Sequence, residues 1–341
     1  MATTPKRRAL ILISSARQLP LASPVSVPSV STGFFLVELA QVLKEFEDTH
    51  EFTLATPDGN TPQLDINGMG LAFHAIEKLG TAMVGTGLEQ RRRHFTVDAF
   101  RRRHADLVER REQELQLLER HLGRLPVSEI LPRTDPEAAA FRPELVKRME
   151  TLPAKAYHSV QDLVRRHRDP GDAFDFAGLD FVHLPGGHAP MVDFRDDPWI
   201  GETLHLAREN GAVTSLICHA PVALTSTSQR IDAENRPYRL ADRDNPFHGT
   251  GITVATKNGE KIALKAGYVA VPGEKTTLTY FVDDALKEAG FKIAGSLNPS
   301  AVKLAHHPGL RLITGNGPQT IDRQATEIRN ALATGPVRTP A

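Results

Sequence analysis

The fold is decided by the stretch Ala212-Val213-Thr214-Ser215-Leu216-Ile217-Cys218-His219-Ala220-Pro221-Val222-Ala223-Leu224. Its first half is apolar and partly β-branched, which is typical of a buried central strand. Pro221 is tolerated in the first turn of a following helix, because the N–H that it lacks would be unpaired there. The stretch therefore predicts a strand, a turn at Cys218 and a helix, with the cysteine at the carboxyl end of the strand.

Cys218 is the only cysteine in the chain and the candidate nucleophile. Unpaired amides and the helix dipole favour an anion at a helix N-terminus, so we expect the pKa of this thiol to lie below its ordinary value of about 8.5. The alternative is a buried, inert core cysteine. The choice between the two depends on which partners the rest of the sequence supplies.

The segments around this unit predict an α/β fold, doubly wound around a mostly parallel sheet. Apolar runs bounded by turn residues predict strands at residues 9–13, 51–56, 179–184, 212–217, 252–255, 291–293 and 310–314. Helical spacing of apolar residues predicts helices at 33–46, 201–210, 279–289 and 320–332. A Pro- and Ser-rich loop is expected at 18–32, at the mouth of a site. Such alternation of strands and helices is typical of a parallel sheet covered on both faces.

Residues 81–170 interrupt this pattern. They have almost no strand signal and are dense in Arg, Glu and Leu. The spacing of four leucines predicts one face of a long helix, formed by Leu107, Leu115, Leu118 and Leu122. We therefore predict a helical insertion at 81–170, acting as a cap or an interface. The α/β core domain that carries the site would comprise residues 1–80 and 171–341.

Composition excludes several classes of protein. The 341 residues are 40% apolar and carry no formal net charge, which argues against a nucleic-acid partner. The triplets Arg91-Arg92-Arg93 and Arg101-Arg102-Arg103 lie among glutamates, as expected for a solvated mixed-charge face. A single cysteine excludes an intrachain disulfide or a multi-cysteine metal centre and favours a reducing compartment. Since no apolar run is long enough to span a membrane, we expect a cytoplasmic protein without a membrane partner.

Glu38 is the candidate acid–base partner of the thiol. It lies on the helix after the first strand, near the carboxyl ends of the strands, where ligands of doubly wound folds bind. Its apolar neighbours Leu36, Val37 and Leu39 favour a partly buried carboxyl with a raised pKa, able to exchange a proton with sulfur or substrate. The alternative is an exposed glutamate on a helix surface.

Gly186 and Gly187 close another predicted strand, and glycines there let backbone amides approach a ligand closely, as in an oxyanion hole. The alternative is an ordinary tight turn. We expect that His219 does not fold back easily onto Cys218, and that a carboxylate from another loop fixes its orientation. Glu260 is the candidate for that carboxylate, and the alternatives are Asp232, Asp242, Asp244 and Glu274.

These elements together resemble a known family. Pro185-Gly186-Gly187-His188, the residues around Cys218-His219, and Glu38 are similar to the PfpI-type superfamily of class I glutamine amidotransferase-like, flavodoxin-like folds, and within it to the glyoxalase III and heat-shock chaperone branch. The resemblance covers about residues 8–75 and 175–333, with further support at Asn245-Pro246, Gly267-Tyr268, Pro272-Gly273 and Leu312-Ile313-Thr314-Gly315.

The resemblance implies a role for each candidate. Cys218 would be the nucleophile, Glu38 would share its proton and act as acid–base, His219 would pair with an Asp or Glu, and the amides of Gly186 and Gly187 would stabilise an oxyanion. The implied activity is a cofactor-independent and glutathione-independent glyoxalase III-like lyase. It would convert a small reactive carbonyl substrate, a 2-oxoaldehyde such as methylglyoxal, to a 2-hydroxy acid through a hemithioacetal on the cysteine. The family also implies a homodimer.

Two features depart from the family. The insertion at 81–170 is unlike its compact members and leaves substrate size open. Some bacterial relatives carry a metal site of two histidines and a carboxylate, which the matching stretch Glu45-Phe46-Glu47-Asp48-Thr49-His50-Glu51 does not reproduce. Because the other histidines show no HExxH or similar spacing, no metal or other cofactor is expected.

Three alternative functions remain open at this stage. A cysteine hydrolase or peptidase would use Cys218 and His219 on a larger substrate. A stress chaperone or redox sensor would use the same cysteine as an oxidisable thiol beside an apolar surface. A glutaminase would need a His-x-Glu motif late in the chain, and none follows residue 290.

Overall fold

The computed structural model describes residues 5–266, 268–296, 298 and 300–335. Gly267 of the resemblance and the last six residues of the predicted 171–341 segment lie outside the described residues. In the described part of the chain, no helix has the length and apolar character needed to cross a membrane. The strands (β), α-helices (α) and 3₁₀ helices (η) are, in chain order, β1 (Arg7–Leu12), β2 (Gln18–Ser23), β3 (Ser29–Ser31), α1 (Leu36–Phe46), β4 (His50–Thr56), η1 (Ile66–Met69), η2 (Leu71–Lys78), α2 (Leu79–Gln90), α3 (Val97–Arg103), α4 (Ala105–Leu122), α5 (Pro136–Glu150), β5 (His158–Ser159), α6 (Val160–Arg168), η3 (Phe176–Gly178), β6 (Leu179–Leu184), α7 (Pro190–Asp193), α8 (Pro198–Glu209), β7 (Val213–Ile217), η4 (Ala220–Ser228), β8 (Gln229–Ile231), β9 (Pro237–Arg239), η5 (Asp242–Asp244), β10 (Gly251–Ile252), α9 (Lys257–Ala266), β11 (Thr277–Leu278), α10 (Val282–Glu288), β12 (Lys292–Ile293), β13 (Leu304–His307), η6 (Pro308–Leu310), β14 (Leu312–Gly315), η7 (Pro318–Thr320) and α11 (Ile321–Ala333).

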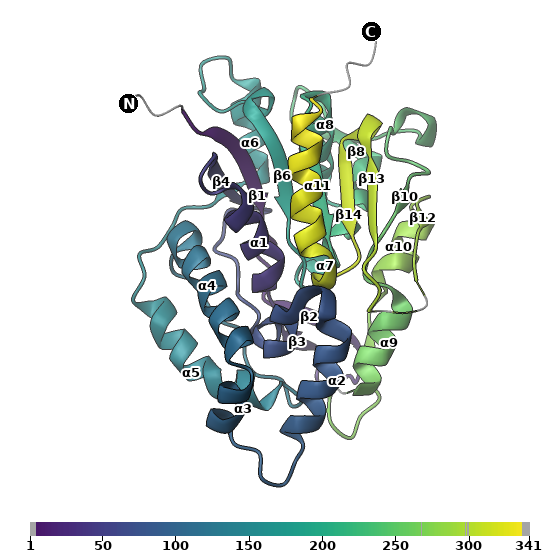
Figure 1. The fold of residues 1–341 in the computed structure, drawn as a ribbon. Helices are drawn as coiled ribbons and strands as arrows, with labels where there is room; N and C mark the ends of the chain where they lie inside the picture. The colour runs from purple at the N-terminus through teal and green to yellow at the C-terminus, as the bar shows by residue number, and fades with distance from the viewer. Residues whose placement is uncertain (1–4, 267, 297, 299, 336–341) are drawn as a thin grey trace.

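A seven-stranded sheet runs through the centre of the molecule (Figure 1), with the strand order β13-β14-β7-β6-β1-β4-β5. Neighbouring strands are parallel, except that the edge strand β13 runs antiparallel to β14. On the central strand β1, Ile11 pairs with Leu54 of β4 on one side and with His183 of β6 on the other. The predicted doubly wound, mostly parallel α/β fold is confirmed.

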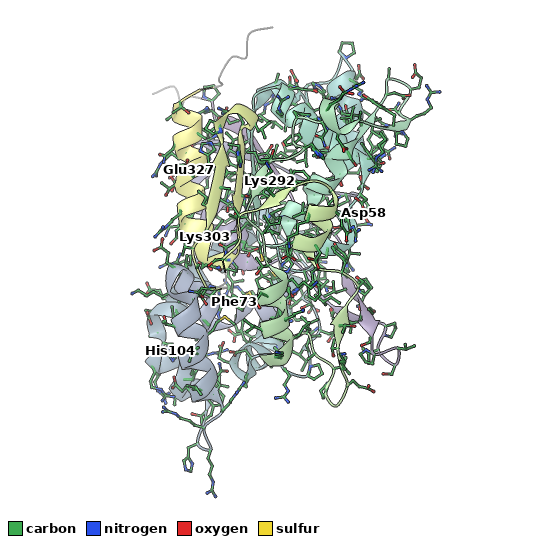
Figure 2. The ribbon with its side chains drawn as sticks, turned by 90° about the vertical axis from the view of Figure 1, so that its right-hand side faces the viewer. Asp58, Phe73, His104, Lys292, Lys303 and Glu327 are labelled. Carbon is green, nitrogen blue, oxygen red and sulfur yellow. The ribbon has the colours of Figure 1, made fainter. Side chains whose placement is uncertain are left out.

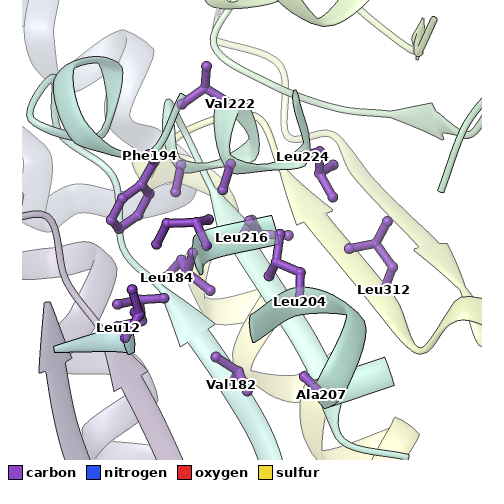
Figure 3. Packing of buried hydrophobic residues seen from close by; sticks show 14 of the residues in the cluster. Leu12, Val182, Leu184, Phe194, Leu204, Ala207, Leu216, Val222, Leu224 and Leu312 are labelled. Carbon is purple, nitrogen blue, oxygen red and sulfur yellow. The ribbon is translucent and has the colours of Figure 1, made fainter. Parts of the chain in front are cut away.

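Alternate residues of the central strands face two separate hydrophobic layers. On β1, Leu10 and Leu12 pack with α6, α8 and α10, while Ala9 and Ile11 pack with α1 and α11. Figure 3 shows the first layer, in which Leu184 and Leu216 of neighbouring strands meet residues of α8 and η4. Because both faces are covered by helices, these strands are mostly apolar on both faces rather than alternating with exposed polar residues, and His183 and Ser215 are buried among them.

The structure corrects several expected boundaries. The loop expected at 18–32 is wrong, because β2 and β3 form an antiparallel hairpin and β11 joins β2. The segment is rich in Pro and Ser, which is typical of a loop, although alternate residues of β2, Leu19 and Leu21, are buried as in a strand. The strands expected at 252–255 and 291–293 are shorter, and as β10 and β12 they pair with each other outside the main sheet. The edge strands β13 and β5 were not predicted, since short edge strands lack a continuous apolar run.

Residues 81–170 contain most of α2 and all of α3 to α5, β5 and α6. Leu115, Leu118 and Leu122 of α4 pack in the same hydrophobic layer as α1, and α6 packs on the opposite face of the sheet. In Figure 1 the blue helices α2 and α3 lie beyond the end of the sheet toward which β1 runs. The division of the chain into a core and an insertion remains a prediction.

Replacement of a buried leucine between the sheet and its helices tests this packing. Leu216 of β7 has no exposed surface, whereas Leu88 of α2 is 61% exposed. We expect Leu216→Ala to lower the free energy of unfolding by about 2 to 5 kcal/mol through lost burial and a residual cavity. Leu88→Ala should change it by less than about 0.5 kcal/mol. Urea denaturation of both variants measures the two values, and equal losses would contradict the assignment of Leu216 to the core.

Candidate active site

Cys218 occupies a sharp turn between β7 and η4. Its φ of 62° lies in the left-handed region, which costs a non-glycine residue roughly 1 to 3 kcal/mol. Two backbone hydrogen bonds hold it there, because its N–H donates to the carbonyl of Gly315 and its carbonyl accepts from the N–H of Ala255, each at 2.9 Å. The structure thus places the cysteine at the turn that the sequence indicates, although the following helix is of the 3₁₀ type.

The left-handed turn brings His219 back toward the thiol. Nδ1 of His219 lies 3.2 Å from Sγ of Cys218, so the expectation that the adjacent histidine cannot easily reach the sulfur is wrong. Its other ring nitrogen, Nε2, lies 3.0 Å from Oε1 of Glu260, on α9. Among the carboxylates considered, Glu260 makes this contact, whereas Asp232 is bound to Arg236. A continuous chain of thiol, imidazole and carboxylate results.

His188 shares the same carboxylate and was given no role in the sequence analysis. Its Nε2 lies 3.1 Å from Oε2 of Glu260, and its ring centroid lies 4.3 Å from that of His219. Burial opposes protonation of His188, but the carboxylates of Glu260, Asp65 and Glu38 outweigh burial and raise its pKa. Burial and the nearby charge of His188 lower the pKa of His219. The arrangement favours an ion pair between His188 and Glu260 beside a neutral His219.

Glu38 is fully buried against the cysteine. Its Oε2 accepts a hydrogen bond from the N–H of Gly186 at 2.9 Å, and its Oε1 has no hydrogen-bond partner among the described residues. Burial raises the pKa of Glu38 to about 7, although Cys218, the Gly186 amide and His188 favour the charged form. A buried carboxyl with a raised pKa is what the sequence predicts at this position.

The pKa of Cys218 is raised rather than lowered. Burial of the thiol is the largest cause, and the negative charges of Glu38 and Glu260 add to it, while the Gly187 amide favours the thiolate. The expected effect of the helix N-terminus is therefore outweighed by burial, together with two carboxyl groups that the linear sequence does not place beside the sulfur. Formation of the thiolate consequently depends on a neighbouring group that accepts the proton.

Gly186 and Gly187 allow the close approach of these groups. A methyl group on Gly186 would lie 2.7 Å from both Cβ of Cys218 and Oε2 of Glu38. Gly187 has a φ of 86°, and a methyl group there would lie 2.3 Å from the carbonyl oxygen of Gly33. Of the two amides expected to form an oxyanion hole, that of Gly186 binds Glu38 in this structure, which leaves the Gly187 amide beside the sulfur.

A buried polar chain fixes the backbone at Glu38. Burial lowers the pKa of His183 to about 4, so its ring is neutral and can donate one N–H. Nε2 of His183 lies 2.9 Å from the carbonyl oxygen of Glu38, and Nδ1 lies 3.1 Å from Oγ of Ser215. That hydroxyl accepts a hydrogen bond of 2.8 Å from Nε2 of Gln324. Sequence spacing did not reveal this chain, because its members come from β6, β7 and α11.

A cavity of about 580 Å³ opens onto this arrangement. Its lining includes Cys218, His219 and Glu260 together with Tyr268, whose ring centroid lies 5.6 Å from that of His188. The lining also includes residues of η2 and α2, so the helices after β4 form one wall of the site. A volume of this size is ordinary for a small-molecule pocket.

His188, His219 and Glu260 also have the donor set of a metal site, with ligand atoms that all lie within 4.8 Å of one another. The sequence showed no such spacing because the three residues come from three separate segments. Both oxygens of Glu260 already contact the two imidazoles, so a metal ion would have to replace these contacts. The expectation of no metal stays a prediction.

The fold and the site together define a class, that of doubly wound α/β proteins with a cysteine at a strand-to-helix turn. No family model matches the chain. The Protein/nucleic acid deglycase HchA of Staphylococcus aureus (strain JH9) is 27% identical over 139 residues, which are 40% of this chain and 40% of the relative. The match therefore spans less than half of that relative.

Solved structures extend the likeness to the whole fold. The Rapid Encystment Protein 24 KDa of Francisella tularensis aligns with a TM-score of 0.53 and 15% identity, over 96% of this chain and 99% of that one. Glyoxalase III of Candida albicans aligns with a TM-score of 0.47 and 13% identity, over 95% and 97% of the two chains. The first of these two likenesses shows a shared fold over almost the whole of both chains, and the local sequence match is to a protein named as a deglycase.

The raised pKa of Glu38 predicts a pH-dependent cost to stability. The unfolded chain releases this proton near pH 4.5 and the folded chain near 7, so the folded state loses stability as pH rises through that window. A difference of this size amounts to about 3 kcal/mol. We expect the stability of Glu38→Gln relative to the wild type to increase by about this amount between pH 5 and pH 8, as measured by urea denaturation. The exposed Glu51 supplies a control, and an equal change in Glu51→Gln would contradict the assignment.

Proposed function

We propose that the chain is a cysteine-dependent, glyoxalase III-like enzyme that converts a 2-oxoaldehyde to a 2-hydroxy acid without glutathione. The observation that carries the proposal is the contact of one buried thiol with a neutral imidazole on one side and a buried carboxyl of raised pKa on the other. The carboxyl and the imidazole act in different steps of the reaction. The relative named as a deglycase supports an enzymatic role for this arrangement.

The first step joins the thiol of Cys218 to the aldehyde carbon. As the S–C bond forms, the thiol proton passes to the carboxylate of Glu38. Glu38 then gives this proton to the former aldehyde oxygen, which completes a hemithioacetal and leaves the carboxylate ionised. Cys218 is among the residues that line the cavity. The amide of Gly187 and the protonated His188 stabilise negative charge that develops on oxygen.

The second step moves a proton between the two carbons of the substrate. Glu38, once more ionised, removes the proton from the carbon bonded to sulfur, and the pair of electrons forms the double bond of an enediolate. Glu38 returns this proton to the adjacent carbon, and the hydroxyl proton of the hemithioacetal passes to the oxygen of that adjacent carbon. The product is a thioester of the 2-hydroxy acid. One carbon is oxidised and its neighbour is reduced, so no external oxidant or reductant enters the balance.

The last step hydrolyses the thioester. His219, neutral and oriented by Glu260, accepts a proton from a water molecule that attacks the carbonyl carbon. The C–S bond then breaks, and the proton returns to the sulfur. The product leaves as the 2-hydroxy acid and the free thiol is restored.

A cysteine hydrolase of a larger substrate is the second candidate, and the size of the cavity favours it. The same thiol and imidazole would attack an ester or amide carbonyl, but that reaction has no proton to move between adjacent carbons. Glu38 would then be dispensable for thioester formation. The effect of Glu38 on turnover of the two substrate classes therefore separates the candidates.

Conversion of methylglyoxal to lactate by the purified protein, without glutathione, tests the proposal. We expect turnover in the wild type and a loss of at least about 10³-fold in Cys218→Ala, because the nucleophile is removed. Glu38→Gln should lose a similar factor while it still reacts with a thiol reagent. Unimpaired turnover by Cys218→Ala or by Glu38→Gln would refute the mechanism.

The pH dependence of kcat/KM supplies a separate prediction. Since the ionised form of Glu38 accepts the thiol proton, kcat/KM should rise with pH, with an inflection near 7 in the free enzyme. Residual activity of Glu38→Gln should lack this inflection. A profile that falls as pH rises through 7 would mean that the carboxyl acts in its protonated form.

A further inference from the structure

The cavity is much larger than the substrate of the proposed reaction requires. Methylglyoxal has about the bulk of three water molecules, each of which occupies about 30 Å³ in the liquid. It would therefore leave most of the 580 Å³ unfilled. The additional space lies between the cysteine turn and three other segments, which are α2, the loop before α5 and the segments that flank β13 and β14.

Three cationic side chains line this space. Arg91 follows the last residue of α2, Arg133 precedes α5, and Lys303 precedes β13. Figure 2 shows Lys303 and Phe73 where the yellow strands meet the blue helices, and both belong to the cavity lining. In the part of the chain that the structure describes, none of the three cations makes an ion pair or a side-chain hydrogen bond.

The carboxylates of the lining have partners of their own. Asp135 accepts hydrogen bonds from Nε2 of Gln90 and from the backbone N–H groups of Glu137 and Ala138. Glu260 is shared by the two histidines. The cavity therefore has an excess of positive charge that its own acidic residues do not neutralise.

Other arginines between residues 81 and 170 differ in this respect. Most of those on the helices are held by carboxylates, namely Arg101, Arg103, Arg110, Arg111, Arg120, Arg142, Arg148, Arg166 and Arg168. Arg92, Arg93 and Arg102 have no ion pair in the described structure and are exposed to solvent, as Arg91, Arg133 and Lys303 are, but they do not line the cavity. These three provide a matched control set of equal charge.

We propose that the substrate carries an anionic group, a carboxylate or a phosphate, and that Arg91, Arg133 and Lys303 bind this group while its reactive carbonyl lies at Cys218. The guanidinium group presents parallel N–H donors to two oxygens of either anion, and the ammonium group adds a third charge. The position of the carbonyl rests on the proposed function, whereas the anion subsite rests on the cavity and its charges alone. The protein thus selects a larger, acidic carbonyl compound over methylglyoxal.

Alkylation of the single cysteine tests the subsite without any turnover. The reagents are 4-(iodoacetamido)benzoate and its neutral counterpart iodoacetanilide, which form the same S–C bond and release iodide. We expect the second-order rate constant for the anionic reagent to exceed that for the neutral one by about 10-fold at low salt, and the ratio to fall as salt is added. The triple variant Arg91→Met, Arg133→Met, Lys303→Met should bring the ratio close to one.

The control triple variant Arg92→Met, Arg93→Met, Arg102→Met should keep the wild-type ratio. A ratio near one in the wild type, or an equal loss in both triple variants, would overturn the proposal. Protection of Cys218 by benzoate or by phenyl phosphate distinguishes the two anions. Protection by neither compound at concentrations up to about 10 mM would also count against the subsite.

Turnover separates this inference from the proposed function. The kcat/KM for 4-carboxyphenylglyoxal should exceed that for phenylglyoxal by about 10-fold. The cavity triple variant should lose this preference, whereas the control triple variant should keep it. If neither aldehyde is converted but the alkylation ratio behaves as expected, the anion subsite stands and the glyoxalase mechanism fails. If both are converted at equal rates and the alkylation ratio is near one, the mechanism stands and the subsite fails.

Discussion

The structure depends on one unfavourable interaction, the burial of the Glu38 carboxyl beside the thiol of Cys218. In water each group would ionise at its ordinary pKa, but here burial raises both pKa values, and the negative charge of Glu38 raises that of Cys218 further. The pair is held in place by the amide of Gly186 and by the neutral ring of His183, which contacts the Glu38 carbonyl. The cost to stability is expected, because groups that must exchange a proton at neutral pH have to be removed from solvent.

On the other side of the sulfur lies a second carboxyl, that of Glu260, whose pKa is lowered rather than raised. Burial alone would raise the pKa of Glu260, but contacts with two imidazoles lower it well below its ordinary value. One carboxylate thus keeps His188 charged and leaves His219 neutral, since two adjacent imidazoles do not both hold a proton easily. Two glutamates of the same site differ in protonation because one faces a thiol and the other faces two histidines.

Much of the fold could be predicted from the sequence, because the central strands are continuous apolar runs that end at Gly, Pro or the Cys218 turn. The hairpin at 18–32 and the edge strands β5 and β13 could not, since their pairing partners are distant and their composition is that of loops. Cys218, Glu38 and Glu260 were proposed as site residues from local patterns and the family resemblance, and the structure brings them together. His183 was missed because its contacts come from neighbouring strands and from the last helix.

The sequence by itself determined the order of strands and helices, the turn at Cys218 and the Gly186-Gly187 pair, because these follow from local apolar runs and from residues that only certain turns accept. Tertiary structure alone decided the pKa values, the sharing of Glu260 between His188 and His219, and the cationic lining of the cavity. These properties depend on distances between charges and on removal of water. The distances between these charges are set only when the parallel strands align their carboxyl ends. Water is removed only when the helices of residues 81–170 cover those ends.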